Sequence, residues 1–398
     1  MKNRKRNRIK RAALILVGLL LLGCLGGTAV SLITNRNLPI SEMNAAQLSA
    51  LDKARLAEIF QLRQALGDQT WPGWGSADIP VIVYNDAYAF LVGYEGQPPA
   101  GWLKIPGKEP QGNPWQIAPD DTFQGQPYFR SPLAEDGTTP QAFTVQVGDE
   151  WVASLHTRPA MRVVMARQFR DMLPDGVSDV LPYALVADIF LRNSDSYVAA
   201  ILHESFHAYQ GLQVPERLAA SEQTNIRHGG DYPHEEAPFV ADWQMELDLL
   251  QTAVRAETVA EAAELTRQFL AQRAARRANA DLSAPLIDYE RQREWQEGLA
   301  LYVELDILRQ AYNDNEYQPV NGMSDDPEFD DYQQFEQRWR QETDQITRMA
   351  GNDGDGRFYY SGMAQAALLD RLLPGWKDRV FDDGVFLEDL LATAVAGS

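Results

Sequence analysis

The sequence of 398 residues has a single cysteine, Cys24, so no disulfide within the chain can stabilise its fold. It also lacks an excess of basic residues, because 36 Lys and Arg stand against 56 Asp and Glu, a net charge of −20. Proteins that bind nucleic acids need a basic surface to displace counterions, so DNA and RNA are excluded as main partners. The motifs G-x-S-x-G and G-x-G-x-x-G and the phosphate-binding loop are absent, which leaves serine-hydrolase and nucleotide chemistry without support.

Acidic residues are also absent before Glu42. Residues 1–11 contain seven basic residues, namely Lys2, Arg4, Lys5, Arg6, Arg8, Lys10 and Arg11. Residues 12–34 then form an uncharged run, which as a helix is long enough to cross a bilayer. By the positive-inside rule this pattern predicts a basic cytoplasmic tail (1–11), a single-pass transmembrane signal anchor (12–34) and an extracytoplasmic remainder. A lipoprotein anchored at Cys24, within the lipobox-like Leu21–Cys24, and a cleaved signal peptide are the alternatives.

The remainder divides by composition. Residues 35–70 predict a juxtamembrane helix or linker, and residues 71–398 a domain that is β-rich over 71–157 and helical over 158–398. Short β-branched or aromatic runs predict strands at 79–84, 87–92, 142–147 and 151–155. Caps and periodicity predict helices at 193–210, 235–256, 259–278, 289–312 and 361–373, with an exposed acidic loop at 313–331. The expected fold class is therefore α+β and mainly α-helical, with a small N-terminal β region preceded by one transmembrane helix.

Two of the five histidines lie in the segment His203-Glu204-Ser205-Phe206-His207. On a helix, positions i and i+4 share one face, so both imidazoles can bind one metal ion while Glu204 serves as general base. Catalytic zinc sites usually have a third protein ligand. The short His-x-x-Gly-x-x-His continuation is missing, and Glu297 in the segment 295–304 is the best candidate, with Glu304 as a rival ligand or a partner of a ligand. Glu235, Glu236 and Glu246 are lesser rivals.

Segment 295–304 has Trp295, Glu297, Gly298, Ala300, Tyr302 and Glu304 in a pattern like W-x-x-E-G-x-A-x-Y-x-E, with the first gap one residue shorter. Together with the H-E-x-x-H pattern at 203–207, it resembles the gluzincin metallopeptidases. The resemblance implies a zincin-like fold and one Zn²⁺ per chain on His203, His207 and Glu297, with Glu204 as base. It departs from the family in the 90 positions between His207 and Glu297, and no G-x-M-E-N-like motif supports exopeptidase activity.

The predicted function is thus a membrane-anchored extracytoplasmic zinc metallopeptidase acting on a peptide or protein substrate. Such an enzyme needs a donor for the negative oxygen of the transition state. Candidate donors are His228, His234, Tyr359 and Tyr360, and any run between Trp71 and Leu155 could provide the strand that binds the substrate backbone. Two further hypotheses use the same residues: a catalytically silent binding module of the cell envelope, and a zinc hydrolase of a non-peptide amide.

Overall fold

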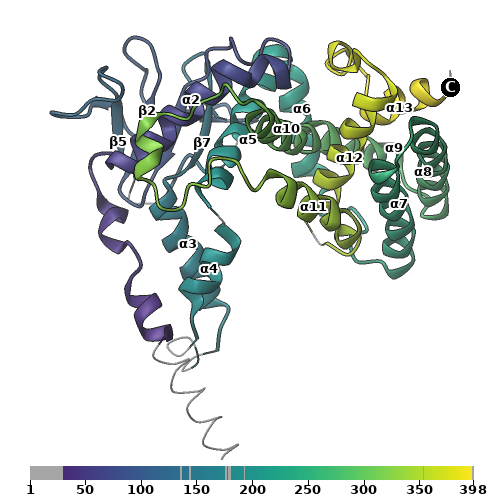
Figure 1. Ribbon diagram of the computed structural model, residues 1–398, viewed down its shortest axis with the longest axis horizontal. Helices are drawn as coiled ribbons and strands as arrows, with labels where there is room; N and C mark the ends of the chain where they lie inside the picture. Colours follow the sequence, from purple (N-terminus) through teal and green to yellow (C-terminus); the bar gives the residue numbers. More distant parts are fainter. Residues whose placement is uncertain are drawn as a thin grey trace, which may run out of the picture. The chain divides into compact units, whose positions relative to one another are not determined.

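The computed structural model describes residues 30–134, 137–142, 145–174, 177, 181–191, 193–352 and 354–396. The chain forms two compact units. Unit 1 consists of Met1–Ala46, Tyr84–Tyr88 and His156–Arg192, and unit 2 consists of Gln47–Val83, Ala89–Leu155 and Asn193–Ser398. Figure 1 shows the described elements, each of which is treated below within its own unit.

Unit 1 is helical. Its described elements are a helical segment at 30–36, the 3-10 turn η1 (Ile40–Asn44), α3 (Arg158–Asp171) and α4 (Tyr183–Leu191). The Thr157 hydroxyl accepts a hydrogen bond from the N–H of Ala160, which caps the first turn of α3. Met43 of η1 packs against Ala160 and Val163, and this small apolar cluster joins η1 to α3.

A seven-stranded sheet is the first layer of unit 2. Its strands are β1 (Val81–Tyr84), β2 (Tyr88–Val92), β3 (Leu103–Lys104), β4 (Gln116–Ile117), β5 (Phe129–Pro132), β6 (Val145–Val147) and β7 (Glu150–His156). They lie in the order β3-β6-β7-β1-β2-β5-β4, and the pairs β3–β6, β6–β7 and β4–β5 are antiparallel. Every residue of β1 is buried, and so are five of the seven residues of β7, so the centre of the sheet is covered on both faces.

The helices of unit 2 contain the candidate site. They are α2 (Ala50–Thr70), α5 (Ser194–Gln213), α6 (Pro215–His228), α7 (Ala237–Arg255), α8 (Val259–Asn279), α9 (Ala284–Arg293), α10 (Leu299–Asn313), α11 (Phe335–Gln345), α12 (Gly356–Leu372) and α13 (Leu387–Ala396). A π-helical turn, η2 (Glu294–Gly298), joins α9 to α10, and short 3-10 turns lie at η3 (Asn321–Asp325), η4 (Ile346–Met349) and η5 (Trp376–Asp378). In Figure 1, α7 and α8 lie side by side next to α12.

The predicted fold class was wrong. The β part is a seven-stranded sheet and not a small β region, while helices make up 59% of the structure. The sequence pattern missed β3, β4 and β5, which have two to four residues each. An alternating pattern needs about four or more residues to be recognised, so strands this short give no signal in a segment rich in proline and glycine.

The predicted transmembrane helix is a second correction. Among the described residues, no helix is both long and apolar enough to cross a bilayer. The predicted anchor, residues 12–34, lies outside the described residues except for 30–34, and the basic tail 1–11 and Cys24 lie wholly outside them.

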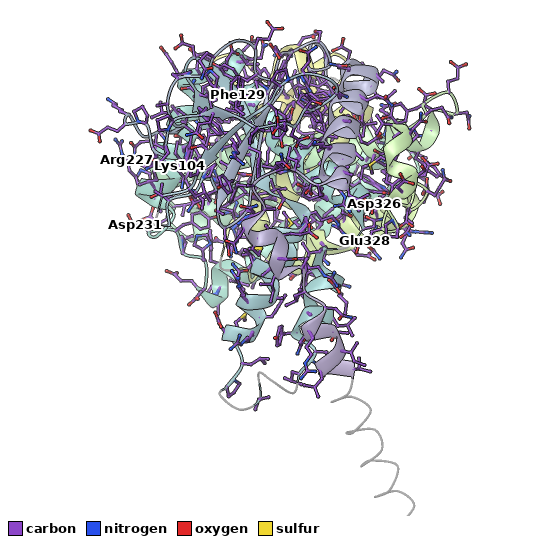
Figure 2. All side chains as sticks on the ribbon, turned by 90° about the vertical axis from the view of Figure 1, so that its left-hand side faces the viewer. Lys104, Phe129, Arg227, Asp231, Asp326 and Glu328 are labelled. Atoms are coloured by element: carbon purple, nitrogen blue, oxygen red, sulfur yellow. The ribbon has the colours of Figure 1, made fainter. Side chains whose placement is uncertain are left out.

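The acidic stretch 313–331 is not simply an exposed loop. Asp326 is buried and accepts hydrogen bonds from Arg55 of α2 (2.7 Å) and from the hydroxyl of Ser194 (2.7 Å), the first residue of α5. The carbonyl of Glu328 accepts a hydrogen bond from the N–H of Ser194 at 2.8 Å. Figure 2 shows Asp326 and Glu328 next to each other. These bonds fix the start of the helix that carries His203 and His207.

Candidate metal centre

Helix α5 presents His203 and His207 on one face. The side chain of Asn193 caps the helix by accepting the N–H of Ser196 at 3.1 Å. The helix was predicted to end at residue 210, but α5 includes Gly211 and continues to Gln213. A Cβ atom at Gly211 would lie 2.4 Å from the indole of Trp151 in β7, so this glycine allows α5 to pack closely on the sheet.

Glu297 lies in the π-helical turn between α9 and α10. The extra residue in such a turn shifts the side chains that follow it around the helix axis, and π turns are frequent at functional sites. Gly298 next to it makes a close backbone contact with Gly362 of α12. A Cβ atom on Gly298 would lie 2.4 Å from the Cα of Gly362. Helix α12 therefore approaches the turn that holds Glu297.

The side chains of His203, His207 and Glu297 converge in the interior. All three are buried, and one potential ligand atom from each lies within 4.8 Å of the other two. The Oε2 atom of Glu297 is 3.5 Å from Nε2 of His203 and 3.2 Å from Nε2 of His207. Ligand atoms in a tetrahedral zinc site are about 3.3 Å apart when each bond is about 2.0–2.1 Å. The three side chains could therefore hold one metal ion.

Gln210 fixes the tautomer of His207. The Nε2 atom of Gln210 donates to the backbone carbonyls of Trp295 (3.1 Å) and Gln296 (3.3 Å), so its Oε1 atom faces Nδ1 of His207, 2.8 Å away. An amide oxygen only accepts hydrogen bonds, so the proton of the neutral imidazole is on Nδ1. The lone pair of Nε2 then points to the common centre, as a metal ligand requires.

Glu304 lies behind His203. Its Oε2 atom is 3.2 Å from Nδ1 of His203, and its Oε1 atom accepts a hydrogen bond from Arg338 of α11. Arg338 also donates to the hydroxyl of Ser196 in the first turn of α5 at 2.9 Å. A carboxylate on the far nitrogen of a histidine is a common partner of metal ligands, because it orients the ring and increases its basicity. This position suits a partner of His203 better than a rival ligand.

Arg293 holds the second oxygen of Glu297. Its Nη2 atom donates to Oε1 of Glu297 at 2.8 Å and to Asp355 at 2.6 Å, and Asp355 also accepts the hydroxyl of Tyr289 at 2.9 Å. Burial alone would raise the pKa of Glu297, but Arg293 and the two histidines hold it well below its usual value. Glu297 is therefore ionised and offers a single oxygen, Oε2, to the centre.

The neighbouring carboxylates favour the protonated forms of both histidines. Burial lowers the pKa of His203, but hydrogen bonds to Glu297 and Glu304 outweigh it and raise the pKa to about 10. The pKa of His207 is raised in the same way by Glu297 against the effect of burial. A metal ion must displace these protons, so binding will be weaker at low pH.

Glu204 and Tyr359 interact electrostatically with the residues of this cluster. Burial raises the pKa of Glu204, and the two neighbouring histidines oppose that shift. The ring of Tyr359 stacks on the ring of His203, with centroids 5.8 Å apart and planes within 9°. Burial and Glu297, to which the side chain of Tyr359 is hydrogen-bonded, raise the pKa of Tyr359 well above its usual value against the effect of Arg293, so its hydroxyl keeps its proton.

Other predicted residues lie elsewhere. Tyr360, next in sequence to Tyr359, donates to Glu342 at 2.6 Å. His234 has its ring Nε2 3.2 Å from the carbonyl of Gly229 and does not belong to the histidine–glutamate cluster. Glu246, a lesser rival ligand, is fully buried but accepts hydrogen bonds from Arg273 and Arg276 at 2.8 Å. The remaining candidates, His228, Glu235 and Glu236, also lie outside that cluster.

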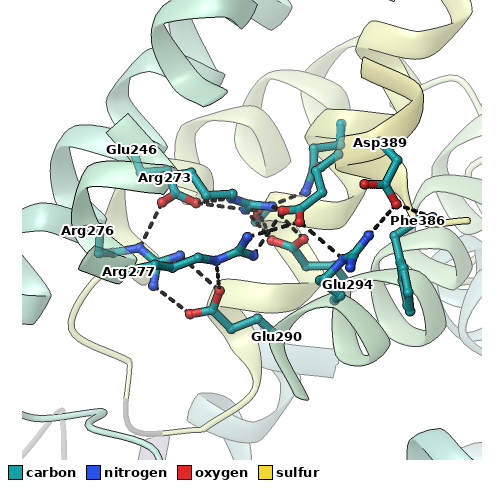
Figure 3. Close-up of polar contacts among 12 residues, drawn as sticks. Glu246, Arg273, Arg276, Arg277, Glu290, Glu294, Phe386 and Asp389 are labelled. Carbon is teal, nitrogen blue, oxygen red and sulfur yellow. Dashed lines mark hydrogen bonds and ion pairs between the residues drawn. The ribbon is translucent and has the colours of Figure 1, made fainter. Parts of the chain in front are cut away.

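A buried ion network supports the π-helical turn. Figure 3 shows arginines of α8 pointing at carboxylates on neighbouring helices. Arg273 donates to Glu294 in the turn and to Glu388 of α13, at 2.8 and 2.9 Å, while Arg276 binds Glu246 and Glu290. The hydroxyl of Ser361 in α12 also donates to Glu294. Glu294 is one helical turn before Glu297, so this network fixes the backbone that carries the third ligand.

Gln210, Arg293 and Arg338 were not predicted from the sequence. Gln210 follows His207 by three positions and Arg293 precedes Glu297 by four, so both share a helix face with a ligand. That spacing was the one available signal for these two residues. Arg338 comes from a distant helix and gave none. Comparison with known protein families, characterised proteins and solved structures finds no match to this chain.

Proposed function

We propose that this protein is a zinc-dependent hydrolase that cleaves peptide bonds, with one zinc ion per chain held by His203, His207 and Glu297. The observation that carries the proposal is the convergence of three buried ligand atoms with separations of 3.2 and 3.5 Å around Oε2 of Glu297. The tautomer imposed by Gln210 and the carboxylate behind His203 support it, since both features are typical of zinc-binding histidines. The gluzincin-like sequence pattern is consistent with the same ligand set.

The chemistry follows from the residues around the centre. Bound zinc would supply Lewis-acid polarisation and make water a better nucleophile at neutral pH. Glu204, whose pKa is raised by burial, would accept the proton of the attacking water and pass it to the leaving amine. Tyr359 would donate its hydroxyl proton in a hydrogen bond to the carbonyl oxygen as negative charge develops there. Glu304 and Gln210 would keep the two imidazoles in place.

Metal analysis of the purified full-length protein tests the ligand set. We expect about one zinc per chain, lost in His203→Ala and in Glu297→Ala, because two remaining ligands hold zinc weakly. His234→Ala is the matched control, since His234 does not belong to the cluster. Wild-type protein that remains free of zinc after equilibration with the metal would refute the proposal.

Digestion of a peptide library tests the reaction. Glu204→Gln should keep the zinc and lose hydrolysis, because the variant removes the base and leaves the ligands in place. Zinc binding without cleavage of any peptide would instead favour the silent binding module. Cleavage of a cell-envelope amide that is not a peptide bond would favour the third hypothesis.

A further inference from the structure

Exposed apolar side chains are concentrated in unit 1. Among the described residues, ten of the fifteen large hydrophobic side chains that are most exposed belong to this unit. They are Val30, Leu32, Ile33, Ile40, Met172, Val177, Leu181, Leu185, Ile189 and Phe190. Met172, Ile189 and Phe190 are 78%, 69% and 63% exposed. Large exposed apolar patches are uncommon on soluble proteins and mark surfaces that bind another molecule or a membrane.

Several of these side chains lie on neighbouring elements of unit 1. Helix α4 buries Ala184, Ala187 and Leu191 and leaves the stripe Leu185–Ile189, spaced i and i+4, facing outwards. The ring of Phe190 lies 5.1 Å from that of Phe169 of α3, whose C-terminal end is followed by Met172.

The helical segment 30–36 lies beside the start of α4. Asn35 donates to the carbonyl of Leu181 at 2.9 Å and accepts the N–H of Ala184 at 3.2 Å. The exposed side chains of Val30, Leu32 and Ile33 therefore come from a segment that is hydrogen-bonded to the α4 region. The unit 1 apolar surface is the name used below for the exposed side chains of Val30, Leu32, Ile33, Met172, Leu185, Ile189 and Phe190.

The charge of unit 1 is opposite to that of the rest of the chain. Unit 1 contains 13 Lys and Arg against 6 Asp and Glu, a net charge of +7, and seven of these basic residues lie at 1–11, outside the described residues. Unit 2 contains 23 against 50, a net charge of −27. Asp188, the one charged residue of α4, is paired with Arg162 through two hydrogen bonds of 2.6 and 2.8 Å. The net positive charge of unit 1 thus comes from residues 1–11, which precede Val30, Leu32 and Ile33 in the sequence, while most of the acidic charge is in unit 2.

We propose that the unit 1 apolar surface binds the surface of a lipid bilayer that contains anionic lipids. Apolar side chains on a helix face insert into the interfacial region, and basic residues add attraction to anionic headgroups. The uncharged run 12–34 favours a bilayer over a protein partner, because it follows the basic residues 1–11 and ends with the exposed Val30, Leu32 and Ile33. This inference is independent of the zinc site and does not require any segment to span the membrane.

Fluorescent labels on the full-length protein test this inference. The lone cysteine permits a Cys24→Ser background, in which Phe190→Cys or the control Ile226→Cys is labelled and the protein is bound to phosphatidylcholine–phosphatidylglycerol vesicles. Ile226 on α6 is 67% exposed and belongs to unit 2. We expect brominated lipids to quench the label at 190 and not at 226. We also expect iodide to quench the label at 190 about fivefold less than at 226.

Two results would overturn the inference. A label at 190 as open to iodide as the one at 226 would show that the surface faces water. A label shielded from iodide but not quenched by brominated lipids would show that a second copy or another protein covers it. Replacing phosphatidylglycerol with neutral lipid should reduce the quenching by brominated lipid, because the net charge of +7 would no longer contribute. Unchanged quenching in neutral vesicles would contradict the electrostatic part of the proposal.

Discussion

The close approach of α12 to the π-helical turn predicts a severe effect for Gly362→Ala. A Cβ atom at this position would lie 2.4 Å from the carbonyl oxygen of Glu294 and 2.7 Å from the Cα of Gly298. Ordinary van der Waals contact begins at 3.4 Å, so the two backbones would have to separate by roughly 1 Å. Both opposing atoms are backbone atoms, which means that no side chain can rotate to relieve the contact.

The magnitude follows from two opposing effects. Overpacking of this kind costs about 1–3 kcal/mol, and a contact between backbones belongs at the upper end of that range. Alanine favours a helix over glycine by about 1 kcal/mol. We therefore expect the free energy of unfolding to fall by about 2 kcal/mol. A 1 Å shift of the turn also displaces Glu297, so zinc affinity should fall together with stability.

Chemical denaturation and zinc titration of the variant measure both effects. Gly230→Ala is the control, because a Cβ atom at Gly230 meets no atom within 4 Å. The control should leave stability and zinc affinity close to those of the wild type. Stabilisation of the Gly362→Ala protein by about 1 kcal/mol, the gain expected for an unhindered helical glycine, would refute the close helix contact and the placement of Glu297 that depends on it.

Three further predictions concern the site and its support. Gln210→Leu should weaken zinc binding roughly 10- to 100-fold in a competition titration, because the proton on Nδ1 of His207 loses its acceptor. Unchanged zinc affinity would contradict the tautomer assigned to His207. Tyr359→Phe should lower kcat roughly 10²- to 10³-fold while zinc content is retained, and Tyr360→Phe, whose hydroxyl binds Glu342, should not. Arg276 and Arg277 overcome the effect of burial and lower the pKa of Glu290 to about 2 from an ordinary value of 4.5. The ionised carboxylate therefore stabilises the fold above pH 4.5. This contribution, roughly 3 kcal/mol, is lost as the pH falls towards 2. Acid titration of stability should show a smaller loss over this range in Glu290→Gln; an equal loss would exclude Glu290 as the cause.

The sequence was informative about helices and weak on the sheet. Helical periodicity and the caps Asn193 and Thr258 predicted α5 and α8 close to their observed starts, because a cap is a local interaction between neighbouring residues. The end of α5 was predicted before Gly211, because glycine often follows the last residue of a helix, but the helix includes it. Its backbone is helical, and the reason for glycine there is the indole of Trp151, about sixty positions away in the sequence. Rules for helix ends use only neighbouring residues, so they cannot predict this contact.

The sequence by itself determined which side chains could act together on one helix. His203, Glu204 and His207 share α5 because the helical repeat places positions i and i+4 on one face, whatever surrounds the helix. Only the tertiary structure decided where Glu297, 90 positions later, meets them. That meeting depends on a π-helical turn, on the close contact of Gly298 with Gly362 and on a buried network of arginines and glutamates. These interactions join helices that are distant in the sequence, so their geometry arises only when the core of unit 2 is packed.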